Sequence, residues 1–414
     1  MKPSVLVSLV SEQTVPNYLS IKTFHEADYY FFISTQLMED SVKGNRREWL
    51  IHAAGIDMGK TNMILVNPEL KEDVYQKLSE IPWKDEFSRI IVNITGGTKM
   101  MSLASYEFFK NLTPEIWYIP INSNDYHRVD DSSVKKTVSY RMSVEEYLAC
   151  CGIRKETNQF QEKSPLFDFK TNLRLFNQLV SCETCKPTIE LIRLLFRDYD
   201  ALLKNQINKK RGIDLSDKNF ISFFLEKLEK RKDIIPESKY LKLKEVGSFD
   251  FIFDFFDEIG FPYAERDRLF SEQVSYITGG WFEEYSYYIL KRISESPDDQ
   301  FKLGVVLDST KDSYFTSNDL DVVMVYNNSL YVVECKSGGL EENELFNKTV
   351  YLQAALRKYF GLSVKSALMT LSDTSESQKK KAETLGISMI DRNILLDRDS
   401  DDKIRSILRL KKAT

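Results

Sequence analysis

Short apolar runs separated by segments of helical periodicity dominate the first third of the chain. Such alternation is typical of a parallel sheet whose strands are joined by helices. Residues 135–142 predict an additional edge strand, and residues 144–151 predict a closing helix. The pattern therefore predicts an α/β domain with a parallel sheet over residues 1–153. The apolar runs that predict its central strands are 5–10, 29–33, 63–66, 90–94 and 116–119.

The character of the sequence changes in the middle of the chain. Long charged and apolar stretches at 188–203 and 218–230 have the pattern of helices. We therefore predict a helical connector over residues 154–276 and a separate C-terminal α/β domain over residues 277–414. The breaks between the helices of the connector fall at Pro187, Gly212 and Pro236.

A β-hairpin pattern lies near the C-terminal end. Two β-branched and aromatic runs, 318–326 and 329–336, flank an Asn-Asn pair at 327–328, which is typical of a tight two-residue turn. If the loop consists of these two residues, Asp321 lies directly opposite Glu334 on the neighbouring strand. The hairpin therefore brings two carboxylates together.

The charges of this hairpin need an explanation. Cross-strand neighbours are about 5 Å apart, where like charges repel each other, and Lys336 shares a face with Glu334. A divalent cation between the carboxylates would remove the repulsion and activate a water molecule, as in a metal-dependent nuclease. The alternative is a surface hairpin in which Asp319 and Lys336 form an ordinary ion pair. The apolar flanks 322–325 and 332–333 favour a buried sheet, where charges without a role are costly.

A second chemical signal is a Gly-Gly turn between a buried strand and an amphipathic helix. Gly96 and Gly97 let backbone N–H groups approach a ligand closely, and the new helix adds its positive N-terminal end. Thr95, Thr98 and Lys99 supply hydroxyls and a cation, so the turn suits a phosphate group. Its spacing is neither that of a P-loop nor that of a dinucleotide fingerprint. Plain packing of the glycines is the alternative interpretation.

A polar loop follows the first strand, at residues 5–10. Ser11, Gln13 and Thr14 precede Pro16, which suits the first turn of a helix. In an open α/β sheet, ligands bind outside the carboxyl ends of the strands. We therefore expect this loop and the Gly-Gly turn to border one ligand site.

Together these motifs resemble a known family. The loops Ser-Glu-Gln-Thr-Val-Pro-Asn at 11–17 and Thr-Gly-Gly-Thr-Lys-Met at 95–100 are similar to those of the CRISPR-associated Rossmann fold (CARF) sensor domain, which binds cyclic oligoadenylates. The Asp-x12-Glu-x-Lys spacing of Asp321, Glu334 and Lys336 resembles the PD-(D/E)xK nuclease superfamily. The order of that superfamily's core, helix, three strands, helix, strand, is matched by the helix-like segment 279–290, the strand-like run 301–307, the hairpin, the helical segment 347–360 and the strand-like run 364–371. The whole chain resembles the CARF plus PD-(D/E)xK ancillary nucleases of type III CRISPR systems.

The resemblance implies roles for individual residues. Lys336 would orient the attacking water, and Glu283 or its neighbour Glu284 would supply an acid from the preceding helix. The implied catalytic residues are Asp321, Glu334, Lys336 and Glu283, and the implied ligands of Mg²⁺ or Mn²⁺ are Asp321, Glu334 and the backbone carbonyl of Cys335. The implied ligand-binding residues are Ser11, Gln13, Thr14, Pro16, Asn17, Thr95, Gly96, Gly97, Thr98, Lys99 and Met100.

Composition adds constraints on size, partners and compartment. A chain of 414 residues suggests two or three domains, and no apolar run approaches the ~18 residues of a membrane span. Five cysteines without an export signal indicate a cytoplasmic protein with reduced thiols. The net charge of −5 is unexpected for an enzyme of nucleic acids, so a local basic groove is required. Candidates for this groove are Lys348, Arg357, Lys358 and Lys365.

We therefore expect a homodimeric, metal-dependent endonuclease of RNA or DNA that a cyclic oligoadenylate activates. A ring with an even number of units, such as cyclic tetra-adenylate, matches the two-fold axis of a dimer. Because sensing and cleavage fall in different domains, we expect the connector and the dimer to couple them. Two alternatives stay open: a sensor without enzymatic activity, and a protein that binds and slowly degrades the cyclic ligand. The sequence does not distinguish RNA, single-stranded DNA and duplex substrates.

Overall fold

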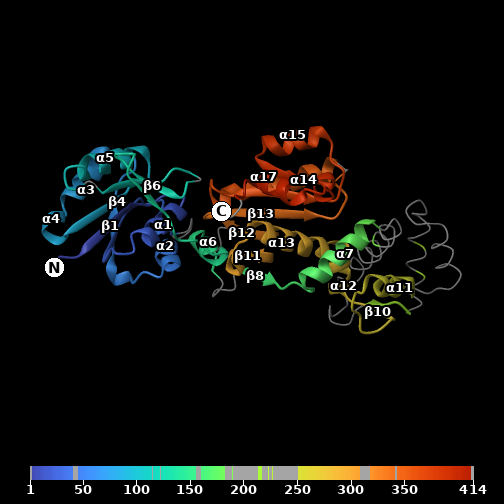
Figure 1. Cartoon of the computed structure of the whole chain (residues 1–414). Helices are drawn as coiled ribbons and strands as arrows, with labels where there is room; N and C mark the ends of the chain where they lie inside the picture. The colour runs from blue at the N-terminus through green and yellow to red at the C-terminus, as the bar shows by residue number, and fades with distance from the viewer. Residues whose placement is uncertain are drawn as a thin grey trace.

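The computed structural model of the chain is elongated and contains two large α/β units (Figure 1). Its described residues form one sheet of seven strands, one sheet of six strands and a two-stranded ribbon. In Figure 1 the seven-stranded sheet lies at the end that carries the N-terminus, and the six-stranded sheet lies next to it. The structure describes residues 2–40, 45–113, 115–121, 123–154, 160–181, 189, 213–216, 222, 226, 250–307, 318–340 and 343–411.

The N-terminal sheet has the strand order β3-β2-β1-β4-β5-β6-β7. The pairings from β3 to β5 are parallel, and the last two pairings are antiparallel. The chain winds outward from the central strand β1 in both directions, so the predicted Rossmann-like α/β fold is confirmed. The strands are β1 (Ser4–Leu9), β2 (Tyr29–Ser34), β3 (Thr61–Leu65), β4 (Arg89–Asn93), β5 (Ile116–Tyr118), β6 (Asp125–Arg128) and β7 (Lys135–Thr137).

Helices cover both faces of this sheet. Val5 and Val7 of β1 pack in one apolar cluster with α3, α4 and α5, whereas Leu6 packs in another with α1, α2 and α6, as the alternation of side chains along a strand requires. The predicted closing helix is α6. The helices are α1 (Val15–Thr23), α2 (Arg46–Ala54), α3 (Lys71–Ser79), α4 (Trp83–Glu86), α5 (Lys99–Phe109) and α6 (Val144–Cys150), with a 3-10 turn at Met58–Lys60.

The C-terminal sheet has the order β15-β14-β13-β12-β11-β8. The pairings from β8 to β13 are antiparallel, and those from β13 to β15 are parallel. The strands are β8 (Phe160–Lys163), β11 (Phe301–Leu307), β12 (Asn318–Tyr326), β13 (Ser329–Lys336), β14 (Lys365–Thr370) and β15 (Ile387–Ile390). The helices around it are α7 (Phe169–Ser181), α13 (Trp281–Ser294), α14 (Asn343–Phe360), α15 (Glu376–Thr384), α16 (Arg392–Leu395) and α17 (Ser400–Leu408), with a 3-10 turn at Asp298–Gln300.

Parts of the predicted connector belong structurally to the C-terminal sheet. β8 pairs with β11 at the edge of that sheet, and α7 packs against α13. The helices predicted at 188–203 and 218–230 lie outside the described residues, apart from isolated positions. The other described elements of this region are β9 (Ile213–Asp214), α11 (Asp250–Ile259), β10 (Arg268–Leu269), α12 (Ser271–Ser275) and a π-helical turn at Tyr276–Gly280.

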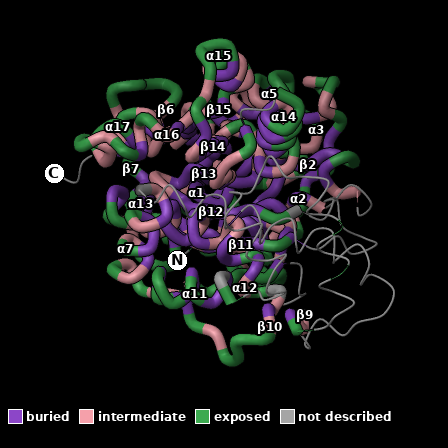
Figure 2. Tube along the Cα trace, turned by 90° about the vertical axis from the view of Figure 1, so that its right-hand side faces the viewer, coloured by how far each residue is buried: buried purple, intermediate pink, exposed green. Residues whose placement is uncertain are grey.

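One apolar cluster spans the two sheets. It joins residues of α1, α2 and α6 to inward-facing residues of the hairpin β12–β13 and of α14, including Val325, Leu330 and Phe360. In Figure 2 the buried positions, drawn in purple, follow β12, β13 and β14. The two α/β units therefore share a packed interface. Within the described ranges, no helix combines the length and the hydropathy needed to cross a membrane.

Candidate functional sites

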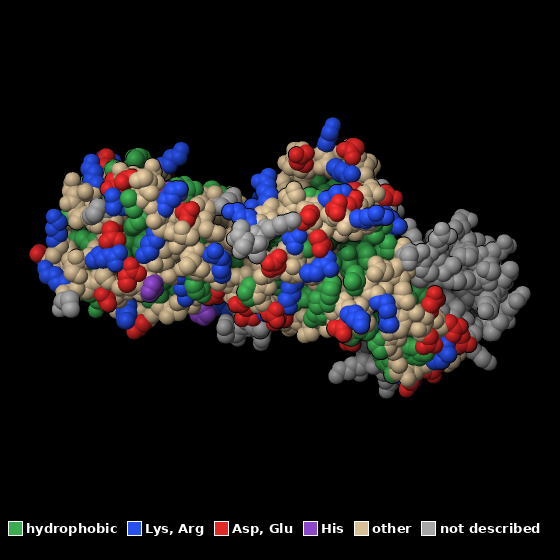
Figure 3. All heavy atoms as spheres, in the orientation of Figure 1, with side chains coloured by type: hydrophobic (Ala, Val, Ile, Leu, Met, Phe, Trp, Pro, Cys, Tyr) green, Lys and Arg blue, Asp and Glu red, His purple; other side chains and the backbone are tan. Residues whose placement is uncertain are grey.

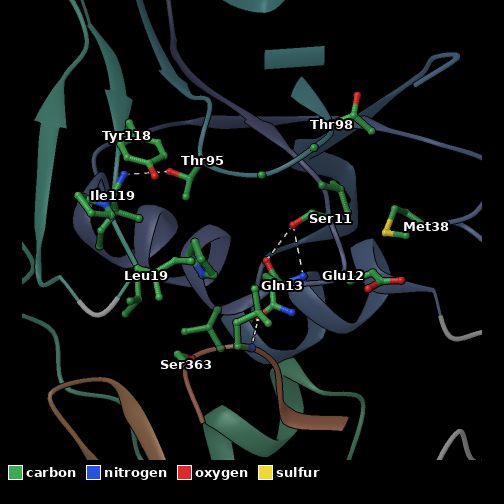
Figure 4. A pocket seen from close by; sticks show the side chains of 18 of the residues that line it. Ser11, Glu12, Gln13, Leu19, Met38, Thr95, Thr98, Tyr118, Ile119 and Ser363 are labelled. Atoms are coloured by element: carbon green, nitrogen blue, oxygen red, sulfur yellow. Dashed lines mark hydrogen bonds between the residues drawn. The ribbon is translucent and has the colours of Figure 1, made fainter. Parts of the chain in front are cut away.

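A cavity of about 620 Å³ opens at the carboxyl ends of β1 and β4, where the sequence predicts a ligand site (Figure 4). Its walls come from the loop after β1, the Gly-Gly turn after β4 and the residues that follow β5. Seven of the predicted ligand-binding residues line it: Ser11, Gln13, Pro16, Thr95, Gly96, Gly97 and Thr98.

The two glycines of the turn are required for different reasons. A Cβ atom on Gly96 would lie 2.1 Å from the carbonyl oxygen of Leu9, so the turn touches the end of β1. Gly97 has a φ of +73°, in the left-handed region that favours glycine. The Thr98 side chain caps α5 by accepting a hydrogen bond from the Met101 N–H at 3.2 Å. The turn therefore holds β1 and the start of α5 close together.

Four of the predicted ligand-binding residues lie outside the cavity wall. The Thr14 hydroxyl donates a hydrogen bond to the carbonyl of Cys150, and the Asn17 amide donates to the carbonyl of Leu9 at 2.8 Å. Lys99 and Met100 are exposed at the start of α5. Thr14 and Asn17 thus hold the loop from inside, whereas Lys99 and Met100 face solvent in a single chain.

The predicted ligand-binding residue Thr95 also has a structural role. Its hydroxyl donates a hydrogen bond to the Asn93 side chain at 2.6 Å and accepts one from the Ile119 N–H at 3.1 Å.

Sequence reasoning missed several other residues of the cavity. Figure 4 shows Leu19 and Tyr118 at the same cavity. The missed lining residues are Val10, Glu12, Val15, Leu19, Thr35, Leu37, Met38, Pro68, Met101, Tyr118, Ile119, Pro120, Ile121 and Ser123, together with Asn327, Asn328, Ser329, Leu362 and Ser363 of the C-terminal unit.

The hairpin β12–β13 has the predicted register. Tyr326 pairs with Ser329, and the pairing continues to Val322 opposite Val333. Asn327 and Asn328 have φ values of +48° and +57°, as a two-residue turn of type I′ requires. One residue beyond the last recorded pair, the same register places Asp321 beside Glu334, so the two carboxylates occupy the same end of the hairpin.

Asp321 is buried in this cluster, with 8% of its surface exposed. One carboxylate oxygen accepts a hydrogen bond from the Cys335 N–H at 2.7 Å. Burial raises the pKa of Asp321 well above its ordinary value, and the negative charges of Glu334 and Glu283 add to this effect. A cation at this position would relieve that cost.

Glu334 has partners on both of its oxygens. The Lys336 ammonium lies 2.5 Å from one oxygen, and the Gln353 amide of α14 donates to the other at 3.0 Å. Burial opposes the charge of Lys336, but the carboxylates of Glu334 and Asp321 outweigh it and raise the pKa of the ammonium group. The Asp319 carboxylate does not form the alternative ion pair with Lys336. It lies 4.0 Å from the Lys163 ammonium instead.

The two adjacent glutamates of α13 point to different surroundings. The Glu283 carboxylate lies 3.6 Å from the Lys163 ammonium, and its pKa is raised by burial, with Lys163 offsetting part of the effect. Glu284 is 2% exposed, and its carboxylate accepts hydrogen bonds from the Tyr276 hydroxyl at 2.6 Å and the Asn172 amide at 3.1 Å. The negative charge of Glu283 raises the pKa of Asp321, whereas Glu284 accepts hydrogen bonds in a separate buried network.

These adjacent residues should respond to substitution in opposite ways. We expect Glu284→Ala to lower the free energy of unfolding by about 3 kcal/mol, because the buried donors of Tyr276 and Asn172 lose their acceptor. Glu283→Ala should leave the unfolding midpoint nearly unchanged, since it removes one carboxylate from a crowded acidic cluster. Denaturant unfolding of both variants measures the difference, and equal destabilisation would contradict this assignment.

The donor atoms of the cluster suit a hard divalent cation. Asp321, Glu334 and the backbone at Cys335 offer oxygen atoms, which Mg²⁺ and Mn²⁺ prefer. Among the described residues, no three His, Cys, Asp or Glu side chains form a complete metal-binding group. A cation at this cluster would be held by two carboxylates, and backbone oxygens and water would have to complete its coordination.

Comparison with known proteins assigns both units. The family model of the Card1 CARF domain matches residues 5–147, and that of the Card1-like endonuclease domain matches residues 270–409. Together the two matches cover more than half of the chain. The chain joins a Card1 CARF domain to a Card1-like endonuclease domain. The predicted pairing of a sensor domain with a nuclease domain is confirmed, and we refer to the two units as the CARF and endonuclease domains.

Solved structures share this architecture over the full length. The protein VC1899 from Vibrio cholerae is 17% identical, with a TM-score of 0.66, and the alignment covers 98% of each chain. Can2 from Sulfobacillus thermosulfidooxidans, solved in complex with cyclic tetra-adenylate, is 20% identical, with a TM-score of 0.64 and coverage of 98% of each chain. No curated protein sequence matches the chain. The structural likenesses indicate a common fold for both domains and their arrangement.

Proposed function

We propose that this protein is a metal-dependent endonuclease that cyclic tetra-adenylate activates. The observation that carries the proposal is the presence, in one chain, of a large CARF-domain cavity and a buried carboxylate–lysine cluster on the endonuclease sheet. Can2, which shares the fold of both domains, was solved with cyclic tetra-adenylate. The reaction we assign is hydrolysis of phosphodiester bonds in RNA or DNA by water.

The chain's own residues divide the work of this reaction. Asp321, Glu334 and the Cys335 carbonyl would hold Mg²⁺ or Mn²⁺, which supplies a water molecule of lowered pKa and stabilises the charge on the scissile phosphate. Lys336, already beside Glu334, orients the attacking water and offsets negative charge on the phosphate. Gln353 fixes the orientation of the Glu334 carboxylate through its other oxygen.

The ligand cavity supports a dimer as the active form. The cavity is open to solvent, and Met100 and Leu103 of α5, the helix that also carries the lining residue Met101, are 39% and 54% exposed. Two copies related by a two-fold axis would join two such cavities over one ring, and an even-membered ring matches that axis. Lys99, exposed at the start of the same helix, would then face the phosphates of a shared ligand.

On the face of the molecule seen in Figure 3, Lys and Arg side chains are interspersed with Asp and Glu over both domains, so this face has no single basic patch that would mark a substrate groove. A cavity of about 500 Å³ in the endonuclease domain is lined by Arg357 and Lys365, two of the predicted groove residues, and by Lys379 and Arg409. We propose that basic side chains near these residues contact the nucleic-acid backbone.

Incubating the protein with labelled RNA, single-stranded DNA and plasmid DNA in Mn²⁺ tests this function directly. We expect cleavage of at least one substrate to rise at least about tenfold on addition of cyclic tetra-adenylate, because the ligand favours the active state, and to stop when EDTA removes the metal. Chromatography of the cyclic ligand from the same reactions measures whether it is degraded. Cleavage that is independent of metal, or ligand breakdown without polynucleotide cleavage, would contradict the proposal.

A further inference from the structure

The endonuclease domain forms part of the wall of the CARF cavity. Asn327, Asn328 and Ser329 at the turn of the hairpin β12–β13 line it, and so do Leu362 and Ser363, which follow α14. Figure 4 shows Ser363 near Gln13 at the base of the cavity. A ligand in the cavity therefore meets both domains at once, without the connector lying between them.

The hairpin turn is attached firmly to the CARF domain. The buried Asn328 side chain accepts a hydrogen bond from the Met142 N–H at 2.9 Å. Its amide nitrogen donates to the Tyr140 carbonyl at 3.0 Å and to the Asn124 side chain at 3.3 Å. Asn327 lines the cavity, and its side chain has no hydrogen-bond partner among the described residues. One asparagine thus fixes the turn, and the other is available to a ligand.

The loop after α14 is attached at the same place. The Gln13 side chain of the ligand loop accepts a hydrogen bond from the Leu362 N–H at 2.9 Å. The hydroxyl of Tyr147 on α6 donates to the Phe360 carbonyl at 3.1 Å and lies 2.9 Å from the Ser363 hydroxyl. Gln13 therefore contacts both the cavity and the endonuclease domain.

Both attached segments, the hairpin turn and the loop after α14, are connected along the chain to the surroundings of the Glu334 carboxylate. From Ser329, β13 runs to Glu334 over five residues, about 17 Å of strand. From Phe360, α14 runs back to Gln353 over seven residues, about 10 Å of helix, and Gln353 binds Glu334. In Figure 1 the β13 arrow points away from the CARF domain. A displacement of the hairpin turn relative to the loop after α14 would change the geometry at Glu334.

We propose that the Asn327–Asn328 turn is the element that senses the cyclic ligand for the endonuclease domain, with Asn327 contacting the ligand and Asn328 anchoring the turn. The proposal rests on the proposed function and assigns its regulation to specific residues. The apolar cluster between the domains makes such coupling effective, because closely packed interfaces change between discrete arrangements. The ligand must contact the turn differently in the two arrangements, since equal contact would shift nothing.

Asn327→Gly in the full-length protein tests this assignment. Glycine favours the same left-handed conformation and removes the side chain with its free amide. We expect cyclic tetra-adenylate at saturation to activate this variant at least about tenfold less than the wild type, because the coupling contact is lost. Calorimetry should show ligand binding weakened less than activation. Glu295→Gly is the matched control, because Glu295 also has a positive φ, of +54°, but lies at the end of α13, away from the cavity.

A second variant and a direct readout complete the test. Asn328→Asp removes the two donors to Tyr140 and Asn124 while keeping the acceptor, and it should also uncouple binding from cleavage. Amide hydrogen exchange of residues 329–336 should change on ligand addition in the wild type and in Glu295→Gly, but not in Asn327→Gly. Full activation of both asparagine variants would overturn the inference alone. A wild type that binds the ligand without activation would overturn the proposed function, and the inference with it.

Discussion

Replacing Glu334 with Gln is expected to abolish nuclease activity while leaving the cyclic ligand bound as in the wild type. The substitution keeps the shape of the side chain but removes the charge that faces Lys336 and Asp321. It also removes a proposed ligand of the divalent cation, so we expect a loss in cleavage rate of at least about 100-fold. Initial rates on the preferred substrate at saturating Mn²⁺ and cyclic tetra-adenylate measure the effect.

The matched control for this variant is Glu344→Gln, because Glu344 is exposed in the first turn of the same helix that carries Gln353. The control should retain full activity and the same thermal midpoint. Calorimetry on Glu334→Gln should return an unchanged affinity for the ligand, since Glu334 is outside the CARF cavity. Full cleavage by purified Glu334→Gln would mean that the hairpin cluster is an ordinary ion pair without a role in catalysis.

The fold was predictable wherever one rule governed a whole element. Buried parallel strands form continuous apolar runs, so β1, β2 and β4 follow directly from the sequence. β6 was missed because its four residues, Asp125–Arg128, include only one apolar side chain, Tyr126. β8 was missed because its burial depends on β11, which is far away in sequence and forms its only described partner strand.

The candidate sites were predictable only in part, for related reasons. The hairpin register follows from a local rule about two-residue turns, and this rule alone places Asp321 next to Glu334. The choice between Glu283 and Glu284 depends on which side of α13 faces the sheet, and neighbouring helix residues differ by about 100° in direction. Gln353 carries no signal of its own, since only the tertiary contact of α14 with β13 brings it to Glu334.

The wall that the endonuclease domain adds to the ligand cavity has the same origin. Gln13 and Leu362 are separated by 349 positions along the chain, and no periodicity or motif connects them. The sequence therefore assigned the coupling to the connector and to the dimer, whereas the structure also provides direct contacts between the domains.

Replacing Gly96 with Ala should weaken ligand binding by displacing the Gly-Gly turn from β1. The new Cβ atom would lie 2.1 Å from the Leu9 carbonyl oxygen, far inside normal contact. That oxygen cannot move away easily, because Leu9 is fully buried at the end of β1 and accepts the Asn17 amide. The Gly-Gly turn must move instead, so we expect the affinity for cyclic tetra-adenylate to fall at least about tenfold and stability to fall by about 1–3 kcal/mol.

Gly59→Ala is the matched control in the same domain, because the atoms nearest its Cβ would belong to the Asp57 side chain, the closest at an ordinary 3.4 Å. This control should bind the ligand normally and be activated normally, which separates the effect of the turn from that of an added methyl group. Thermal unfolding establishes that Gly96→Ala is folded at the assay temperature, and calorimetry then gives its affinity. A folded Gly96→Ala protein with wild-type affinity would mean that the cyclic ligand binds elsewhere, because the cavity cannot keep its shape with the turn displaced from β1.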